Sequence, residues 1–148
     1  MSASSGAVQG SPHGIGFLVR HVHKAFARVL AERLGPYGVT SAQWTVLRSL
    51  WQEDCCSQVD LAANIRVEKA SLTQILSSLE RQGLIVRERS DTDRRRWLVS
   101  LTDQGRALEP LLLPFAGEID RLASTGFSKK ELAELKSLLT RALHHLES

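Results

Sequence analysis

Apolar residues recur along the chain with the period of an α-helix. From Ile15 they return at steps of three and four positions until residues 35–38, whose glycines and proline predict a stop. Thr40 followed by Gln43 has the pattern of a capping box and predicts a second helix that runs to about Trp51. The N-terminal third is therefore expected to hold two amphipathic helices.

A helix-turn-helix and a hairpin are predicted next. Ser57 can cap a short helix, and a second helix follows almost at once and ends at Gly83, where a left-handed residue is favoured. Residues 84–89 and 97–101 are strand-like, and the polar stretch between them is too short for a helix. Two helices around a tight turn, followed by a hairpin, predict a winged helix-turn-helix over about residues 40–101.

The rest of the chain is predicted to be helical again. Thr102 and Ser128 can each cap an apolar periodic segment, and the final segment is rich in leucine. Pro110 and Pro114 each remove a backbone hydrogen bond, so they should kink or break the helix that contains them. The first and last helices are too apolar to remain solvated.

Length and charge add a partner to this picture. The 148 residues fit one domain, which we place at residues 15–148, after a small-residue tail at 1–14 expected to be disordered. The net charge is only +3, yet six arginines lie between positions 81 and 96 against three acidic residues. Such a local basic patch indicates a polyanion as partner.

Several classes of function are not supported by the sequence. No apolar run approaches the roughly 20 residues that span a bilayer, and no signal peptide is evident, so we expect a cytoplasmic protein without membrane contact. No phosphate loop, nucleophile elbow or metal-spaced His/Cys set is present, so we expect neither an enzyme nor a cofactor. His21 and His23 diverge by about 200° on a helix and cannot chelate one ion.

Five segments resemble the MarR family of bacterial transcription regulators. They are residues 57–62, 69–76, 79–85, 93–95 and 101–105. The resemblance covers about residues 15–147, and residues 68–95 are most similar to the SlyA-like branch. It implies a mostly α fold with a small β-hairpin wing, and an intertwined homodimer built from helices at about 15–35 and 103–147. The implied function is binding of a palindromic operator in double-stranded DNA, by a repressor that a small aromatic or phenolic anion releases.

Three residues depart from the family pattern. Arg66 stands where many members carry glycine, and positive φ at an arginine would cost on the order of 1 kcal/mol. The turn must accept that cost or take another shape. Ser90 and Asp91 replace a common Asp-Pro pair at the start of the wing.

The expected DNA contacts lie on the second helix of the motif and on the wing. Gln74 can make a bidentate pair with adenine, whereas serine and threonine specify little. At the wing, Asp93 and Arg95 would project to one side of an extended strand, which makes Arg95 the minor-groove candidate. The full set of expected contacts is Ser57, Lys69, Ala70, Ser71, Thr73, Gln74, Ser77, Arg81, Asp93, Arg94, Arg95 and Arg96.

Two effector hypotheses follow, and one rival function stays open. The resemblance implies a pocket for an aromatic acid, with candidates Arg20, His21, His23, Trp44 and Trp51, although both tryptophans could equally belong to the core. The alternative is a thiol-based redox response through Cys55 and Cys56, of which Cys56 fits a small buried hydrophobe. A winged helix that binds protein instead would lack salt-dependent DNA affinity.

Overall fold

The computed structural model describes residues 13–148, so most of the expected tail lies outside the described residues. The chain divides into two compact units, one that reaches to Phe115 and one that covers Ala116–Ser148. α7 (Pro114–Ala123) spans this boundary, and α8 (Lys129–Glu147) belongs to the second unit. The other elements are α1 (Ile15–Leu34), the 3-10 helix η1 (Gly35–Tyr37), α2 (Ser41–Gln52), β1 (Cys56–Ser57), α3 (Gln58–Ile65), α4 (Lys69–Arg81), β2 (Ile85–Arg89), β3 (Trp97–Leu101), α5 (Asp103–Ala107) and α6 (Glu109–Leu112).

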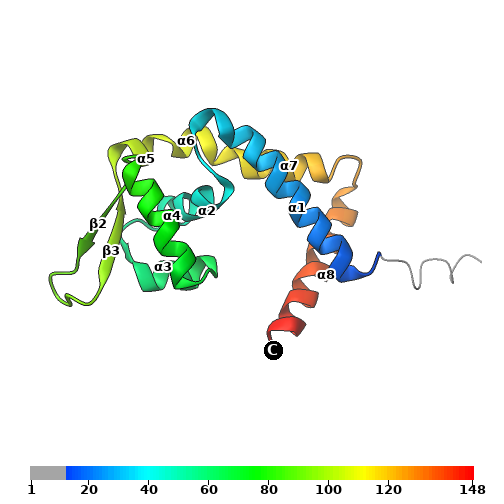
Figure 1. Ribbon diagram of the computed structural model, residues 1–148. Helices are drawn as coiled ribbons and strands as arrows, with labels where there is room; N and C mark the ends of the chain where they lie inside the picture. The colour runs from blue at the N-terminus through cyan, green and yellow to red at the C-terminus, as the bar shows by residue number, and fades with distance from the viewer. Residues whose placement is uncertain (1–12) are drawn as a thin grey trace, which may run out of the picture. The chain divides into compact units, whose positions relative to one another are not determined.

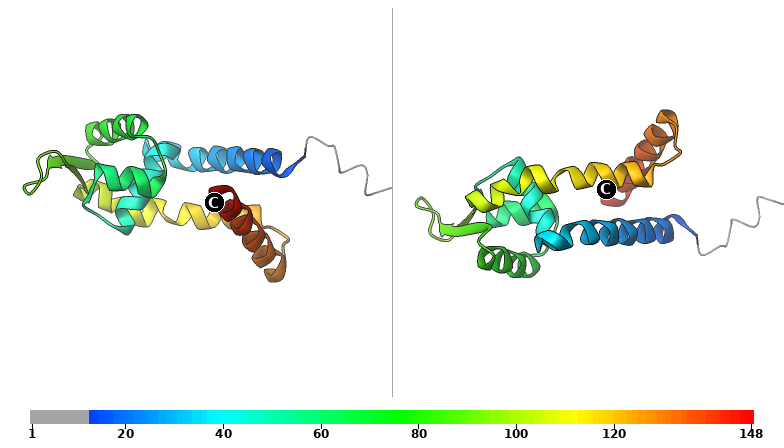
Figure 2. Two further views of the ribbon diagram at one scale, coloured as in Figure 1. Left: turned by 90° about the horizontal axis from the view of Figure 1, so that it is seen from below. Right: turned by 90° about the horizontal axis from the view of Figure 1, so that it is seen from above.

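The middle of the first unit is a winged helix-turn-helix (Figure 1). β2 and β3 form an antiparallel hairpin in which Ile85 pairs with Leu101 and Arg89 with Trp97. The short β1 pairs with the other edge of β3, which gives the strand order β1-β3-β2. The hairpin reaches out beyond α3 and α4 in the views of Figures 1 and 2. The predicted mostly α fold with a hairpin wing is confirmed.

The predicted helix starts are confirmed at the level of their hydrogen bonds. Thr40 Oγ1 accepts from the Gln43 amide at 3.1 Å, and the Thr40 amide donates to Gln43 Oε1 at 2.9 Å. Ser128 and Glu131 make the same reciprocal pair before α8. Each pair satisfies two backbone donors that a helix start leaves without partners.

Three predicted breaks take a definite form. The helical path continues past α1 as η1. It ends at Gly38, which has φ 69°. The two prolines divide the expected fifth helix into α5, α6 and α7, since neither can donate to a continuous ladder. Arg66 adopts φ 57° at the end of α3, so the turn accepts the cost of a left-handed arginine.

A leucine-rich core holds the helix-turn-helix against the base of the hairpin. Its fully buried side chains come from α1, α2, α3, α4, β2, β3 and α6: Leu34, Val46, Leu47, Leu50, Leu61, Leu72, Leu76, Leu79, Ile85, Val99 and Leu112. Burial of each such side chain contributes roughly 1.5–3 kcal/mol relative to exposure. The apolar stripe predicted for α4 is therefore its core face.

A buried amide connects the start of α2 to the end of α4. Gln43 is only 4% exposed, and its Nε2 donates to Ser78 Oγ at 2.6 Å and to Gln82 Oε1 at 2.8 Å. Gln82 Nε2 in turn donates to the carbonyl of Gly38 at 2.7 Å. Because buried polar groups must be paired, these bonds specify the position of α4 against the α1–α2 connection.

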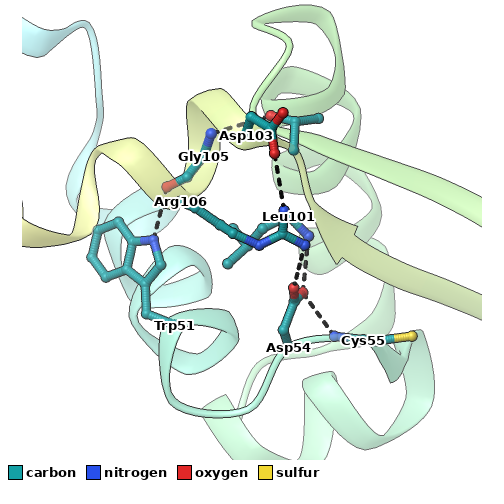
Figure 3. A network of polar contacts seen from close by, with 8 residues as sticks. Trp51, Asp54, Cys55, Leu101, Asp103, Gly105 and Arg106 are labelled. Carbon is teal, nitrogen blue, oxygen red and sulfur yellow. Dashed lines mark hydrogen bonds and ion pairs between the residues drawn. The ribbon is translucent and has the colours of Figure 1, made fainter.

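The hairpin joins α5 through a close backbone contact. Thr102 Oγ1 donates to the Gly83 carbonyl at 2.6 Å and accepts from the Gly105 amide at 3.1 Å. A Cβ at Gly105 would lie 2.2 Å from the carbonyl oxygen of Leu84, so only glycine fits there. The Trp51 indole donates to the Gly105 carbonyl at 2.9 Å and packs this corner against α2 (Figure 3).

An aspartate supports the same corner from the loop before β1 (Figure 3). Asp54 Oδ1 accepts from the amides of Cys55 and Leu101 at 2.8 and 2.9 Å. Its Oδ2 accepts from Arg106 at 3.1 Å, and Arg106 also pairs with Asp103. One carboxylate therefore ties the loop to the end of β3 and to α5.

The second unit leaves an apolar face exposed. Leu135, Leu138, Leu139 and Leu143 of α8 are each at least 42% exposed. In the first unit α1 likewise exposes Ile15, Leu18, Val19 and Val22. Exposed apolar faces of this kind are typical of helices that pack against another chain. Within residues 13–148, no helix is long and apolar enough to cross a membrane.

Gly105→Ala should destabilise the protein by about 2 kcal/mol, because the added methyl group must displace the Leu84 carbonyl. Gly16→Ala in α1 meets no atom within 4 Å and is the matched control, expected to be neutral or slightly stabilising. Urea denaturation at one protein concentration measures both. Equal midpoints for Gly105→Ala and the wild type would contradict the close contact.

Candidate nucleic-acid interface

α4 presents a polar surface opposite its buried leucines. Its exposed side chains are Glu80 and six of the expected contact residues, Lys69, Ala70, Ser71, Thr73, Gln74 and Arg81. The structure places these six on the outside, as expected for a helix that enters a major groove. Gln74 has an amide with donors and acceptor free to read a base edge, since the described residues form no hydrogen bond with it.

Two expected contact residues are placed differently. Ser57 is 5% exposed, and its hydroxyl accepts from the Asp60 amide at 3.1 Å and from Arg96 at 3.3 Å. Ser77 is half-buried and accepts from Arg87 at 3.2 Å. Both hydroxyls are therefore engaged in hydrogen bonds within the protein.

The wing presents Arg95 to solvent. Its side chain is 93% exposed, and Nε lies 3.4 Å from Asp93 Oδ1. The pair was expected on an extended strand, but residues 93–96 form a turn in which the Arg96 amide donates to the Asp93 carbonyl at 3.0 Å. The Arg95 amide also donates to the same carboxylate at 3.1 Å. The aspartate therefore orients the arginine through turn geometry.

The two flanking arginines differ from each other. Arg94 is exposed, which agrees with its expected contact to the phosphate backbone of DNA. Arg96 folds back onto α3, where it lies 3.6 Å from Asp60 Oδ2 in addition to its bond with Ser57. Its charge is partly neutralised there, so its first role is to hold the wing against the helix-turn-helix.

An ion pair that the sequence reasoning missed joins α4 to the wing. Arg87 Nη2 lies 3.1 Å from Glu80 Oε1, and the Arg87 amide donates to Oε2 at 3.3 Å. The side-chain hydrogen bond from Arg87 lowers the pKa of Glu80; burial opposes this shift, and the charge and backbone amide of Arg87 add to the lowering. Seven positions separate the two residues across a helix end, and no local motif marks such a pair.

Trp97 borders two cavities beside this surface. One, of about 220 Å³, is bordered by Lys69, Arg95 and Arg96. The other, of about 520 Å³, is bordered by Gln58, Thr73, Glu80 and Arg87. Gln58 Nε2 donates to Thr73 Oγ1 at 3.1 Å, which connects α3 to the exposed face of α4.

The cysteines lie in the loop that Asp54 supports. Cys55 is exposed and has φ 57°, whereas Cys56 pairs with Val99 in the sheet and is half-buried rather than buried. Burial, followed by the charges of Glu53 and Asp60, raises the pKa of the Cys56 thiol. This disfavours the thiolate, the form that reacts with peroxides.

The expected effector residues are not equivalent in the structure. Arg20, His21 and His23 are exposed on α1, whereas Trp44 is 6% exposed and belongs to the core. Trp51 borders a cavity of about 300 Å³ together with Arg48, Gln52, Glu109 and Leu113. Arg48 was missed in the sequence, although it follows Trp44 by one helical turn and lies 5.2 Å from the centroid of its ring.

Comparisons with known proteins agree with this geometry. The model of the MarR family matches residues 39–97. The organic hydroperoxide resistance transcriptional regulator of Bacillus subtilis (strain 168) is 32% identical over 113 residues, 76% of each chain. A cysteine-to-serine mutant of MarR from E. coli, solved with operator DNA, is 30% identical with a TM-score of 0.80, over 86% of this chain and 92% of that one. Bordetella bronchiseptica BpsR, whose DNA binding is regulated by 6-hydroxynicotinic acid, is 26% identical with a TM-score of 0.80, over 89% and 94%.

Glu80→Gln should reduce the pH dependence of stability. Because its pKa is lowered in the folded protein, ionised Glu80 stabilises the fold fully above the ordinary carboxyl pKa, and this contribution is lost as pH falls through the lowered value. The loss at pH 7 should be below about 1 kcal/mol, since the pair is partly exposed, and should vanish under acidic conditions. Urea denaturation across pH 3–7 tests this, with Glu134→Gln on α8 as control; a difference from wild type that does not change with pH would exclude the ion pair as cause.

Proposed function

Because the chain belongs to the MarR family, we propose that it is a sequence-specific DNA-binding transcriptional regulator that acts as a homodimer on a palindromic operator. We place it in the SlyA-like branch on the residues of 68–95. The observation that carries the proposal is the exposed Arg95 held by Asp93 beside the free outer face of α4. The relative solved with operator DNA supports it.

The two parts of this surface have different roles in the proposal. Gln74 lies on the helix that enters the major groove and reads one base in each half-site. Arg95 reaches from the wing into the minor groove. The negative electrostatic potential of this groove attracts a guanidinium. Arg94 and Lys69 contact phosphates and add affinity without discrimination among sequences.

Arg95→Ala should weaken operator binding by about 1–3 kcal/mol without unfolding the protein, because it removes a groove contact and no core atom. Gln74→Ala should instead relax the base preference of the protein at one position in each half-site. Anisotropy titrations with a selected duplex and with random DNA measure both, and Arg141→Ala on α8 is the control for the loss of one positive charge. Equal effects of Gln74→Ala on selected and random DNA would refute its role in reading sequence.

The homodimer follows from the exposed apolar faces of α1 and α8. A second copy supplies a matching face, and two-fold symmetry then presents two copies of α4 to one side of DNA. Half-site centres roughly 10 bp apart are expected, because that spacing is one helical turn. The operator should therefore be an inverted repeat.

Leu139→Glu combined with Leu143→Glu should abolish the dimer and most of the folded helix with it, since each charge replaces an apolar contact. Ala133→Glu with Ser137→Glu adds the same charge on the other side of α8 and should leave the dimer intact. Sedimentation velocity and circular dichroism report both results. A stable, fully helical monomer from the leucine variant would refute this interface.

The effector is proposed to be a small aromatic acid that releases the repressor from DNA. Arg48 and Trp51 offer a cation and an aromatic wall at one cavity, within the volume range of small-molecule sites. The relative regulated by 6-hydroxynicotinic acid supports this chemistry. Linkage requires operator DNA to weaken effector binding by the same factor by which the effector weakens DNA binding.

Arg48→Gln should weaken binding of salicylate by about tenfold or more, while the neutral salicylamide should bind poorly to both proteins. Arg20→Gln is the matched variant on α1, and the larger loss identifies which arginine binds the carboxylate. Intrinsic tryptophan fluorescence and release of DNA are measured during the titration. If no aromatic acid binds, but an organic hydroperoxide releases DNA and Cys55→Ser prevents it, the redox alternative replaces this effector.

A further inference from the structure

The tip of the wing is closed by hydrogen bonds, although almost every residue in it is polar. The Ser90 amide donates to the Arg96 carbonyl at 2.9 Å, which joins the two ends of the loop. Inside the loop, the Arg96 amide donates to the Asp93 carbonyl at 3.0 Å. A polar loop of this length in water is ordered only when such bonds offset its conformational entropy.

Ser90 is the residue around which the loop folds. It is 8% exposed between strongly polar neighbours. Its hydroxyl oxygen accepts from the amides of Thr92 and Asp93, both at 3.3 Å, and lies 3.0 Å from Thr92 Oγ1. One buried oxygen therefore serves the two amides that start the turn carrying Arg95.

Arg89 fixes the other side of the tip. Its guanidinium lies 4.8 Å from the centroid of the Trp97 ring, and its Nη1 donates to the Arg94 carbonyl. Arg96 is held by Asp60 and Ser57. The inward-facing groups of the tip are thus engaged, while Arg95 projects into solvent with its side chain 93% exposed.

We propose that Ser90 is a positioning residue for DNA binding: its buried hydroxyl holds the wing tip, before DNA arrives, in the geometry that presents Arg95. This inference rests on the proposed function. It adds a specific residue that touches no DNA and acts through the conformation of the loop.

The proposal predicts a loss of affinity by population. When only a fraction of dimers has both wings in the binding geometry, the apparent Kd rises by the inverse of that fraction. Without the hydroxyl, Thr92 and Asp93 lose their shared acceptor and the tip samples other conformations. If about one dimer in five then has both wings competent, the affinity falls about fivefold. The salt dependence should not change, because no cation is removed.

The experiment compares Ser90→Ala with Ser90→Thr and Ser90→Asn, which keep an oxygen acceptor near the same position. Ser100→Ala on β3 is the matched control, since the described residues make no hydrogen bond with the Ser100 side chain. The probe is a duplex enriched by the wild-type protein from a random pool. Ser90→Ala should weaken binding about fivefold at an unchanged salt slope, and Thr or Asn should restore most of the affinity.

Two further measurements separate positioning from general damage. In the Arg95→Ala background, Ser90→Ala should add little, because the residue being positioned is gone. Hydrogen exchange of the free protein should become faster at residues 90–96 in Ser90→Ala and stay unchanged at α4.

The outcomes are distinct from those of the proposed function. The positioning role of Ser90 is wrong if Arg95→Ala weakens binding but Ser90→Ala does not. It is also wrong if Ser90→Ala has the same effect in the wild-type and Arg95→Ala backgrounds. Neither result contradicts the proposed function. If Arg95→Ala has no effect, the wing contact and the positioning role both fail. If the wild-type protein enriches no duplex, the proposed function fails as well.

Discussion

The winged unit depends on the junction at Thr102, where the hairpin, α4 and α5 meet. Its hydroxyl donates to the Gly83 carbonyl directly after α4 and also accepts from the Gly105 amide. The Thr102 amide donates to Leu84, so the backbone on both sides of the hairpin base is satisfied at one place. Because the contact leaves no room for a Cβ at Gly105, small changes there would move the wing relative to α4.

The charged surface above this junction is preordered by internal pairs. Each arginine that stabilises the wing has a partner: Arg87 pairs with Glu80, Arg96 with Asp60, and Arg89 stacks on Trp97. Such exposed pairs contribute little stability individually. Their effect is geometric, because they leave Arg94 and Arg95 as the arginines of the wing that are presented outward. A polyanion then meets an arranged surface instead of a flexible basic segment, which reduces the ordering cost of binding.

The apolar faces of α1 and α8 impose a separate constraint. Exposed leucines and valines along a helix favour association, and the capping box before α8 shows that the start of this helix is a stable local structure. The connection after α1 is hydrogen-bonded to the end of α4. Gln43 and Gln82 make these bonds, and loss of its partners would leave the buried Gln43 amide unpaired.

The amino-acid sequence by itself determined the local structure. The capping boxes, the proline breaks and the hairpin limits depend on neighbours within a few positions, and periodicity alone placed the buried face of α4. The pairing of Asp93 with Arg95 was also predicted, although a turn rather than a strand produces it. Long-range packing decided the rest: Ser57 is buried under Arg96, Trp44 lies in the core, and Arg87 finds Glu80. These contacts join positions that only the tertiary fold brings together, so no local pattern could assign them; the core geometry determines which polar atoms remain for DNA.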